Sequence, residues 1–437
     1  MNHLKLYIKQ SWNLMKQNKL FTGIYVTGTA LAIATTMIMA IVYYVKIAPV
    51  YPEVNRDRTL YLEQSIFVDS KYKGTNSHFF STKALEEWFY PLKNVEAVSA
   101  ELSMGGQELY IQPMNGRTDF PVAYKFTDSQ FFRIYPFRFV EGKPITEADM
   151  QSGIQIAVIT EELARRLFGK STDVVGQTVS MANMEYRVVG VVESASVLTP
   201  KAFAQIYVPY SSMPGYNRTM DTRIPHQGPY QVTFLLKSAD DEEALRQEIA
   251  EIVHKYNHSQ TGWELKIFEQ PFSHTRSVFQ GNVDTDFSWS NVIRKYLLIV
   301  FVLLLVPALN LCGLIAGRMD VRISEMAIRK SFGASKTKLL NQVVCENLLM
   351  TLLGGLIGMV LSWMALVIFR EWIFSLFDNP TLPIAGISTE VTGEMLFAPG
   401  IFLAALLLCV TLNLLSALIP AWLSLRKPIV QSMNEKR

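Results

Sequence analysis

The sequence predicts an α-helical membrane protein with four transmembrane helices and a large α+β extracytoplasmic domain between helices one and two. Three observations lead to this fold. Only 18% of the 437 residues are charged, below the roughly 25% of a typical soluble domain. Four uncharged runs each exceed the roughly 20 residues that a helix needs to cross the hydrocarbon core. Between the first two runs, residues 46–294 change to short β-rich segments broken by Gly, Pro, Asn and Asp.

The four uncharged runs place transmembrane helices at 20–45, 295–317, 346–370 and 396–425. The first run is longer than the apolar core of a signal peptide, which has about 7–15 residues. It also lacks a small-residue cleavage site, so we expect a retained membrane anchor.

The positions of Lys and Arg predict the orientation, because these side chains resist translocation. They gather before helix one (1–19), between helices two and three (318–345) and after helix four (426–437), whereas the 371–395 loop contains acidic residues and no lysine. Both termini are therefore expected in the cytoplasm. Residues 46–294 and 371–395 would face outward.

Residues 1–19 show an apolar stripe at helical spacing, formed by Leu4, Ile8, Trp12 and Met15. Lysines occupy the other faces, which predicts a helix in contact with membrane lipid at the inner interface. The alternative is a simple cytoplasmic extension of the first span.

The extracytoplasmic domain is expected to combine strands with a few helices. An inner boundary near Asp128 and another near Pro200 suggest a smaller inserted lobe at about 128–200. The segments with strand and helix patterns are the following. Strands are expected at Leu60–Phe67, Val122–Phe126, Ile154–Ile159, Tyr186–Val192, Ala204–Val208 and Tyr230–Leu236, and helices at Ser81–Leu92, Glu161–Phe168 and Asp241–Tyr256.

Composition and motifs argue against several functions. The formal net charge is only +3, with no block of basic residues, so nucleic acid is not expected as a partner. Gly169-Lys170-Ser171 resembles the end of a phosphate-binding loop, but Ala164 stands where that motif needs its first glycine. His254, His258 and His274 lack the spacing of a zinc site and read as polar residues at a solvated helix end. We expect no metal and no catalytic residue in this chain.

The connection between helices two and three is the most informative stretch. A short amphipathic helix from about Ile323 to Phe332 would present Glu325, Arg329 and Lys330 to the cytoplasm, and Gly333 would let the chain turn back. A generic loop on the positive-inside side explains the charges, but it does not explain the Glu-x-x-x-Arg spacing that ends in glycine. The pattern indicates a docking element.

At these residues the chain resembles the permease subunits of the MacB/FtsX family, the macrolide-exporter type of ABC transporter. The shared pattern reads Glu-x-x-x-Arg-Lys-x-x-Gly-Ala-Ser. Other segments also match: the third span with Gly354-Gly355-x-x-Gly358, the closing Pro420-Ala421 to Pro428, and the periplasmic-core segments Phe131-Phe132 to Glu141-Gly142 and Val188 to Val192.

The resemblance implies a homodimer, or a dimer with a related permease, that binds cytoplasmic ABC ATPase subunits. ATP would be bound by that partner, so no cofactor is expected in this chain, which is expected to be without the N-terminal ATPase domain of the fused exporters. The resemblance also implies a porter-like lobe beside the inserted lobe at about 128–200, and a location in the bacterial inner membrane. The expected ATPase-coupling residues are Glu325, Ile328, Arg329, Lys330, Gly333, Ala334 and Ser335. ATP-driven movement of the spans would then pass to the extracytoplasmic domain.

Three residues within the spans bear on that movement. Gly354 and Gly358 form a small-x-x-x-small pair that allows close helix approach, although ordinary intramolecular packing explains them equally well. Pro307 removes a backbone hydrogen bond and is expected to kink the second span.

The predicted function is export or extrusion of a substrate, driven by a separate ATPase. A periplasmic adaptor and an outer-membrane channel as partners would favour efflux. The alternative is a signalling device that activates an extracytoplasmic partner, such as a cell-wall hydrolase, without transport. An enzyme with its site in the extracytoplasmic domain is a further alternative, supported only by the three histidines.

Overall fold

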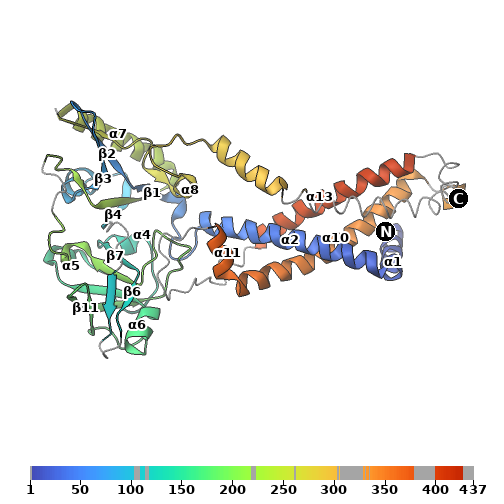
Figure 1. The fold of residues 1–437 in the computed structure, drawn as a ribbon, viewed down its shortest axis with the longest axis horizontal. Coiled ribbons are helices and arrows are strands. Elements are labelled where there is room, and N and C mark those ends of the chain that lie inside the picture. Colours follow the sequence, from blue (N-terminus) through green and yellow to red (C-terminus); the bar gives the residue numbers. More distant parts are fainter. Residues whose placement is uncertain are drawn as a thin grey trace. The chain divides into compact units, whose positions relative to one another are not determined.

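The chain forms two units in a computed structural model. We call Met1–Tyr44, Ser288–Phe377 and Gly393–Arg437 the helical unit, and Val45–Phe287 with Asp378–Thr392 the β-rich unit (Figure 1). The structure describes residues 2–102, 109–113, 118–217, 223–259, 262–302, 305, 328–329, 331–333, 335–377 and 399–426.

The helical unit contains long apolar helices at the expected places. Their bounds are α1 Asn2–Gln17, α2 Lys19–Ile47, α10 Lys336–Ile368, α11 Arg370–Phe377 and α13 Pro399–Arg426, together with a helix over 289–302. Among the described residues, Lys19–Ile47 and Thr337–Ile368 are long and apolar enough to cross a membrane. Most of the expected second span at 295–317 lies outside the described residues, so the number of spans stays a prediction.

α10, the helix of the third predicted span, begins well before the uncharged run that predicted this span. α10 starts at Lys336 because the Ser335 hydroxyl accepts a hydrogen bond from the backbone N–H of Lys338 at 3.3 Å, which caps the helix. The last part of the predicted connection, from Lys336 onward, therefore forms the first turns of the same helix.

The β-rich unit confirms the expected α+β domain. Within its described residues, sixteen strands join one sheet network whose main path runs β15-β2-β3-β14-β4-β7-β12-β9-β11-β10-β5-β6. Most pairs are antiparallel, whereas β9 with β11 and β7 with β12 are parallel. The strand bounds are β1 Thr59–Leu62, β2 Ser65–Asp69, β3 Thr75–Phe80, β4 Val95–Leu102, β5 Leu109–Gln112, β6 Phe120–Val122, β7 Tyr124–Thr127, β8 Phe139–Gly142, β9 Ile156–Thr160, β10 Thr178–Met181, β11 Met184–Val192, β12 Ile206–Pro209, β13 Gln227–Gly228, β14 Tyr230–Leu236, β15 Trp263–Lys266 and β16 Phe272–Ser273.

Helices of the β-rich unit begin where polar caps predict them. The Thr160 hydroxyl accepts from the N–H of Leu163 at the start of α6, and Ser81 caps α3 in the same way. The helix bounds are α3 Thr82–Ala84 continued by the π-helical turn Leu85–Phe89, α4 Phe131–Ile134, α5 Glu147–Ser152, α6 Glu161–Phe168, α7 Glu242–Ser259 and α8 His274–Phe279. Short 3₁₀ turns occupy Arg56–Arg58, Tyr210–Ser212 and Ala239–Asp241.

The structure divides two of the predicted strands, because β6 and β7 also share the segment expected as one strand over Val122–Phe126. The segment expected as one strand over Leu60–Phe67 becomes β1 and β2, because the side chain of Gln270 accepts from the N–H groups of Glu63 and Gln64 at 2.8 and 3.2 Å. These two residues thus bond to a side chain instead of a neighbouring strand. That partner is more than 200 residues away in sequence, so local pattern could not have located the break.

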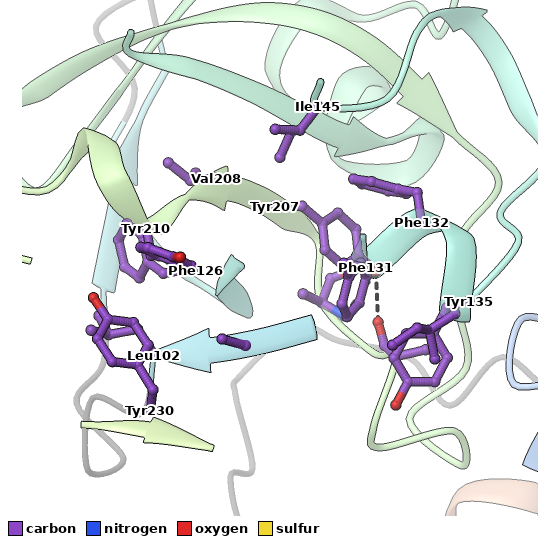
Figure 2. Close-up of a cluster of buried hydrophobic side chains, with 14 of the residues drawn as sticks. Leu102, Phe126, Phe131, Phe132, Tyr135, Ile145, Tyr207, Val208, Tyr210 and Tyr230 are labelled. Carbon is purple, nitrogen blue, oxygen red and sulfur yellow. Dashed lines mark hydrogen bonds between the residues drawn. The ribbon is translucent and has the colours of Figure 1, made fainter. Parts of the chain in front are cut away.

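Aromatic side chains fill the core of the β-rich unit. Phe131 and Phe132 of α4 contact Tyr207 of β12, with ring centroids 5.4 and 5.6 Å apart (Figure 2). The hydroxyl of Tyr207 is satisfied inside the core, since it donates to Ala202 O at 2.9 Å and accepts from Ala204 N at 3.1 Å. Two consecutive phenylalanines therefore serve as packing residues.

Candidate coupling site

The connection that leads into α10 exposes apolar side chains. Within its described residues, Ile328 is 50% exposed and Phe332 is 87% exposed. The backbone N–H of Phe332 donates to Ile328 O at 3.1 Å, which closes one helical turn. Gly333 follows with φ +87°, a conformation that favours glycine. An aromatic side chain held outward on a short turn is suited to a protein interface.

This turn is fastened to the membrane helix behind it. Arg329 Nη1 donates to Gln342 Oε1 at 2.8 Å, and Gln342 lies in the second turn of α10. Ser335 caps the same helix. A partner that pressed on Phe332 would therefore push on α10 itself.

The structure describes four of the seven residues predicted for ATPase coupling: Ile328, Arg329, Gly333 and Ser335. Glu325, Lys330 and Ala334 lie outside the described residues, as does Pro307 of the second span. The role of the whole set in coupling stays a prediction.

Glycines bring α10 into close contact with α2. A Cβ added at Gly358 would lie 2.6 Å from Ala30 O, and one at Gly354 would lie 2.9 Å from the side chain of Thr29. Both distances are too short for a real side chain, so only glycine permits this separation of the helices. Gly355 faces α13 instead, since its Cβ would lie 2.5 Å from Leu406 Cδ1.

A buried ion pair holds the other end of α2. Arg56 is 4% exposed, and its Nε donates to Glu53 Oε2 at 2.7 Å. Its Nη1 donates to Val45 O and Ala48 O at 2.6 and 2.7 Å. The last carbonyls of a helix have no partner within the helix, and the negative end of the helix dipole attracts a cation. Arg56 therefore binds the end of α2 in a directional way.

The same ion pair reaches the segment that precedes β12. Arg56 Nη2 donates to Leu198 O at 3.3 Å, and Glu53 Oε1 accepts from Ala202 N at 2.9 Å. These two partners lie 142 and 149 residues away in sequence and add to the local bonds with Val45 O and Ala48 O. Within the β-rich unit, the ion pair thus links Val45 and Ala48 to the segment before β12.

His274 completes this attachment from a third part of the chain. Its Nε2 lies 2.9 Å from Lys46 O, and its Nδ1 lies 3.1 Å from the hydroxyl of Tyr61. A carbonyl oxygen only accepts, so Nε2 carries the proton and Nδ1 accepts from Tyr61. Burial, helped by the nearby Arg56 cation, lowers the pKa of His274 to about 4, and the ring is neutral at pH 7. We call Glu53, Arg56 and His274 the polar anchor.

Sequence reasoning missed the polar anchor. It treated His274 as an unconvincing metal ligand and gave Glu53 and Arg56 no role. The one available signal was a carboxylate and a guanidinium three residues apart directly after the first apolar run. Their burial could not be inferred, because their other partners are distant carbonyl and amide groups.

The other motifs considered in the sequence have structural roles. Gly169 ends α6 with φ +74°, so Gly169-Lys170-Ser171 follows a helix, whereas a phosphate-binding loop precedes one. His254 and His258 are exposed neighbours on α7, with rings 4.2 Å apart. Among the described residues, no three His, Cys, Asp or Glu side chains are placed to hold a metal ion.

A buried carboxylate lies at the expected inner boundary. Asp128 accepts from the N–H groups of Ala100 and Gln130 at 2.7 and 3.0 Å and from the Ser99 hydroxyl at 2.8 Å. Burial raises the pKa of Asp128 to about 6, although these hydrogen bonds oppose the shift. A cavity of about 520 Å³ opens beside it, next to Tyr90 and Tyr210. Because its oxygens are already bonded, Asp128 ties β4 to the segment before α4.

These features define a class of protein. Long apolar helices pack through glycines, an exposed apolar turn is attached to one of them, and α2 continues into a β-rich unit that binds its end with buried charges. This is the construction of a membrane protein whose first apolar helix leads into a large α+β domain.

Family comparisons agree with that class and specify it. Residues 22–252 match the MacB-like periplasmic core domain, and residues 297–429 match the FtsX-like permease C-terminal domain. The first match alone covers more than half of the chain. The chain belongs to the MacB/FtsX family of ABC transporter permeases, and the resemblance seen in its sequence is confirmed.

Several curated proteins are similar to this chain. The pyoverdine export ATP-binding/permease protein PvdT of Pseudomonas syringae pv. syringae is 24% identical over 371 residues, which are 81% of this chain and 51% of that protein. Macrolide export ATP-binding/permease protein MacB 1 of Yersinia pestis is 24% identical over 360 residues, with the same two coverages. The permease YknZ of Bacillus subtilis is 22% identical over 272 residues, 62% of this chain and 64% of YknZ. The chain spans about half the length of the ATP-binding/permease relatives.

Solved extramembrane domains are also similar. The periplasmic region of MacB from Actinobacillus actinomycetemcomitans is 17% identical, with a TM-score of 0.32, and covers 48% of this chain and 88% of that one. The extracellular domain of YknZ is 17% identical, with a TM-score of 0.34, and covers 48% and 99%.

Proposed function

We propose that this chain is a permease subunit that couples ATP hydrolysis by a separate cytoplasmic ATPase to movement of its extracytoplasmic domain, and that this movement exports a substrate. The observation that carries the proposal is the attachment of both parts of α2. Its membrane part meets α10 through Gly354 and Gly358, and its end is bonded to Arg56. Export is also what the names of the PvdT and MacB relatives describe.

The first step is docking of the ATPase on the turn before α10. Phe332 and Ile328 supply an apolar contact, and Arg329 with the neighbouring Glu325 supplies charge. Because Arg329 and Ser335 bond to α10, displacement of the turn moves the helix. This arrangement requires both termini in the cytoplasm, as the distribution of Lys and Arg predicts.

The second step is transmission along α2. Close glycine packing lets α10 carry α2 with it, since no flexible side chain separates the two backbones. At the far end, Arg56 and His274 bind the carbonyl groups of Val45, Ala48 and Lys46. A shift of the helix end therefore pulls on β1 and on the segment before β12, and that displacement in the β-rich unit performs the export step.

Co-purification tests the docking step. Tagged full-length protein from native membranes should bring an ABC ATPase with it, and Phe332→Ser should lower the retained ATPase at least about tenfold, as for loss of an aromatic anchor worth roughly 2 kcal/mol. Tyr72→Ser is the matched control, because it also removes an exposed aromatic side chain. Tyr72 is 76% exposed and lies in the β-rich unit. Equal ATPase retention in the two variants would contradict docking at this turn.

A second variant tests transmission separately. Replacing the ion pair with Glu53→Met/Arg56→Met removes the bonds from Arg56 to Val45 O and Ala48 O, keeps the bond from His274 to Lys46 O, and leaves the docking turn intact. We expect normal ATPase retention with loss of export. Unchanged export in this variant would show that force does not pass through this ion pair.

A further inference from the structure

An apolar groove lies where α1, α2 and α10 meet in the helical unit. Its volume is about 420 Å³, within the range of roughly 300–1,000 Å³ that small-molecule sites occupy. We call it the α1 groove. It is lined by Trp12, Met15, Lys16, Lys19, Thr22, Gly23, Val26, Leu353 and Ile357.

The groove combines an apolar lining with two cationic side chains. Val26, Leu353 and Ile357 come from the two helices that are apolar enough to cross a membrane. Lys16 and Lys19 flank the junction of α1 and α2, and Lys16 Nζ lies 5.6 Å from the ring centroid of Trp12. No carboxylate of the described residues forms an ion pair with either lysine. Within the described residues, both ammonium groups are therefore available to an anion beside the apolar part of the groove.

Packing at the helix junction preforms the groove. The Thr22 hydroxyl donates to Met15 O at 3.2 Å, which fixes the angle between α1 and α2. Met15 is buried with Tyr25, Val343 and Met350, so α1 is held against α10 as well. Little has to be reordered when the groove is filled, which favours binding.

We infer that the α1 groove binds one acyl chain of an anionic phospholipid, whose phosphate is held by Lys16 and Lys19. The apolar lining accepts hydrocarbon, and the two lysines supply the complementary charge. Both lysines precede the apolar run of α2, which places their ammonium groups at the depth of lipid headgroups, and an exposed Trp12 is typical of that depth. An apolar protein helix would satisfy the lining but leave both charges without a partner. This inference rests on the membrane position of the chain and is independent of ATPase coupling.

Gly23 provides a clean way to close the groove. A Cβ added at Gly23 meets no atom within 4 Å, so Gly23→Leu fits the protein and occupies the space of the acyl chain. Gly28 of the same helix is equally open but does not line the groove, so Gly28→Leu is the matched control. To test the contribution of the two charges, Lys16→Gln/Lys19→Gln is compared with Lys9→Gln. Lys9 is an exposed lysine of α1 that does not line the groove.

The test uses the full-length protein in nanodiscs of equal parts phosphatidylglycerol and phosphatidylcholine, followed by native mass spectrometry of the lipids that stay bound after mild detergent extraction. Two lysines near a headgroup predict a preference for phosphatidylglycerol of about tenfold or more at low salt. The Lys16→Gln/Lys19→Gln variant should lose that preference but keep bound lipid, whereas Gly23→Leu should lose one bound lipid of either type. Gly28→Leu and Lys9→Gln should match the unmodified protein.

Three outcomes would overturn the inference. The first is equal retention of the two lipids by the unmodified protein. The second is retention in Gly23→Leu equal to that in Gly28→Leu. The third is unchanged lipid retention in Gly23→Leu combined with loss of the dimer, which would assign the groove to a second copy of the chain.

Discussion

The two attachments of α2 use opposite kinds of contact. In the helical unit, α2 meets α10 by close approach of backbones at Gly354 and Gly358. In the β-rich unit, the end of the same helix is bound by the charges and ring nitrogens of the polar anchor. Van der Waals contact between helices depends on separation and tolerates small rotations, whereas hydrogen bonds to a buried guanidinium depend on direction. The same helix therefore has one contact that depends on separation and one that depends on direction.

The largest expected effect comes from breaking the ion pair of the polar anchor. Arg56→Met leaves Glu53 buried without its cation, which should cost about 3–5 kcal/mol in the free energy of unfolding of the β-rich unit. Chemical denaturation followed by tryptophan fluorescence measures this change. The Glu53→Met/Arg56→Met protein should lose less, because no uncompensated charge remains.

A surface ion pair is the control for that experiment. Arg165 pairs with Glu161 on α6, and both are partly exposed, so Arg165→Met should cost less than about 1 kcal/mol. If Arg56→Met were no more costly than Arg165→Met, the polar anchor would not hold the end of α2.

The next effect is a pH dependence from His274. Its pKa is lowered in the folded state, from 6.5 to about 4, so its contribution to stability is complete above pH 6.5 and is lost as the pH falls toward 4. The difference in pKa corresponds to about 3 kcal/mol. His274→Gln keeps a donor for Lys46 O but does not titrate, so its stability should fall less between pH 7 and 4. Parallel pH profiles of the two proteins would refute a neutral buried His274.

A substitution at Gly358 tests the contact between α10 and α2. Gly358→Ala puts a methyl group 2.6 Å from a backbone oxygen of α2, so the helices must separate at a cost of about 1–3 kcal/mol. Thermal unfolding in detergent should show the loss. Gly28→Ala, where the added carbon meets no atom within 4 Å, should be neutral or stabilising, since alanine favours helix. A lower thermal stability for Gly28→Ala than for Gly358→Ala would argue against close packing of α2 on α10.

The smallest effect is expected at the cap of α10. Ser335→Ala removes the acceptor for Lys338 N–H and should cost about 1 kcal/mol, confined to the first turn. Hydrogen exchange of the amides at the start of α10 measures it. Ser331→Ala is the control, because its hydroxyl donates only to Ile328 O in the preceding turn. Equal exchange at α10 in both variants would mean that Ser335 does not fix the turn to the helix.

Much of the architecture follows from patterns within short windows. The apolar runs predict α2, α10 and α13, and the strand and helix segments of the β-rich unit lie close to their expected places, as with Glu161–Phe168. The differences have two causes. A long-range partner, Gln270, interrupts the strand expected over Leu60–Phe67, whereas a local cap, Ser335, starts α10 ten residues before the expected span.

The candidate site also has one part that the sequence predicts and one part that it does not. Phe332 and Gly333 belong to a motif that is readable in one stretch of sequence, and the described part of it is an exposed turn that ends in a left-handed glycine. Glu53, Arg56 and His274 have no common motif, because they come together only when the end of α2 meets the β-rich unit.

By itself, the sequence determined the apolar helices, the α+β character of the large domain, the amphipathic turn before α10 and the family, because each depends on residue types at close spacing. Only the tertiary structure decided that Arg56 and His274 hold the last carbonyls of α2, that Gly358 meets Ala30, and that a groove opens between Lys16 and Ile357. The physical reason is that burial and hydrogen bonding depend on distances between groups far apart in the chain, and folding alone brings those groups together.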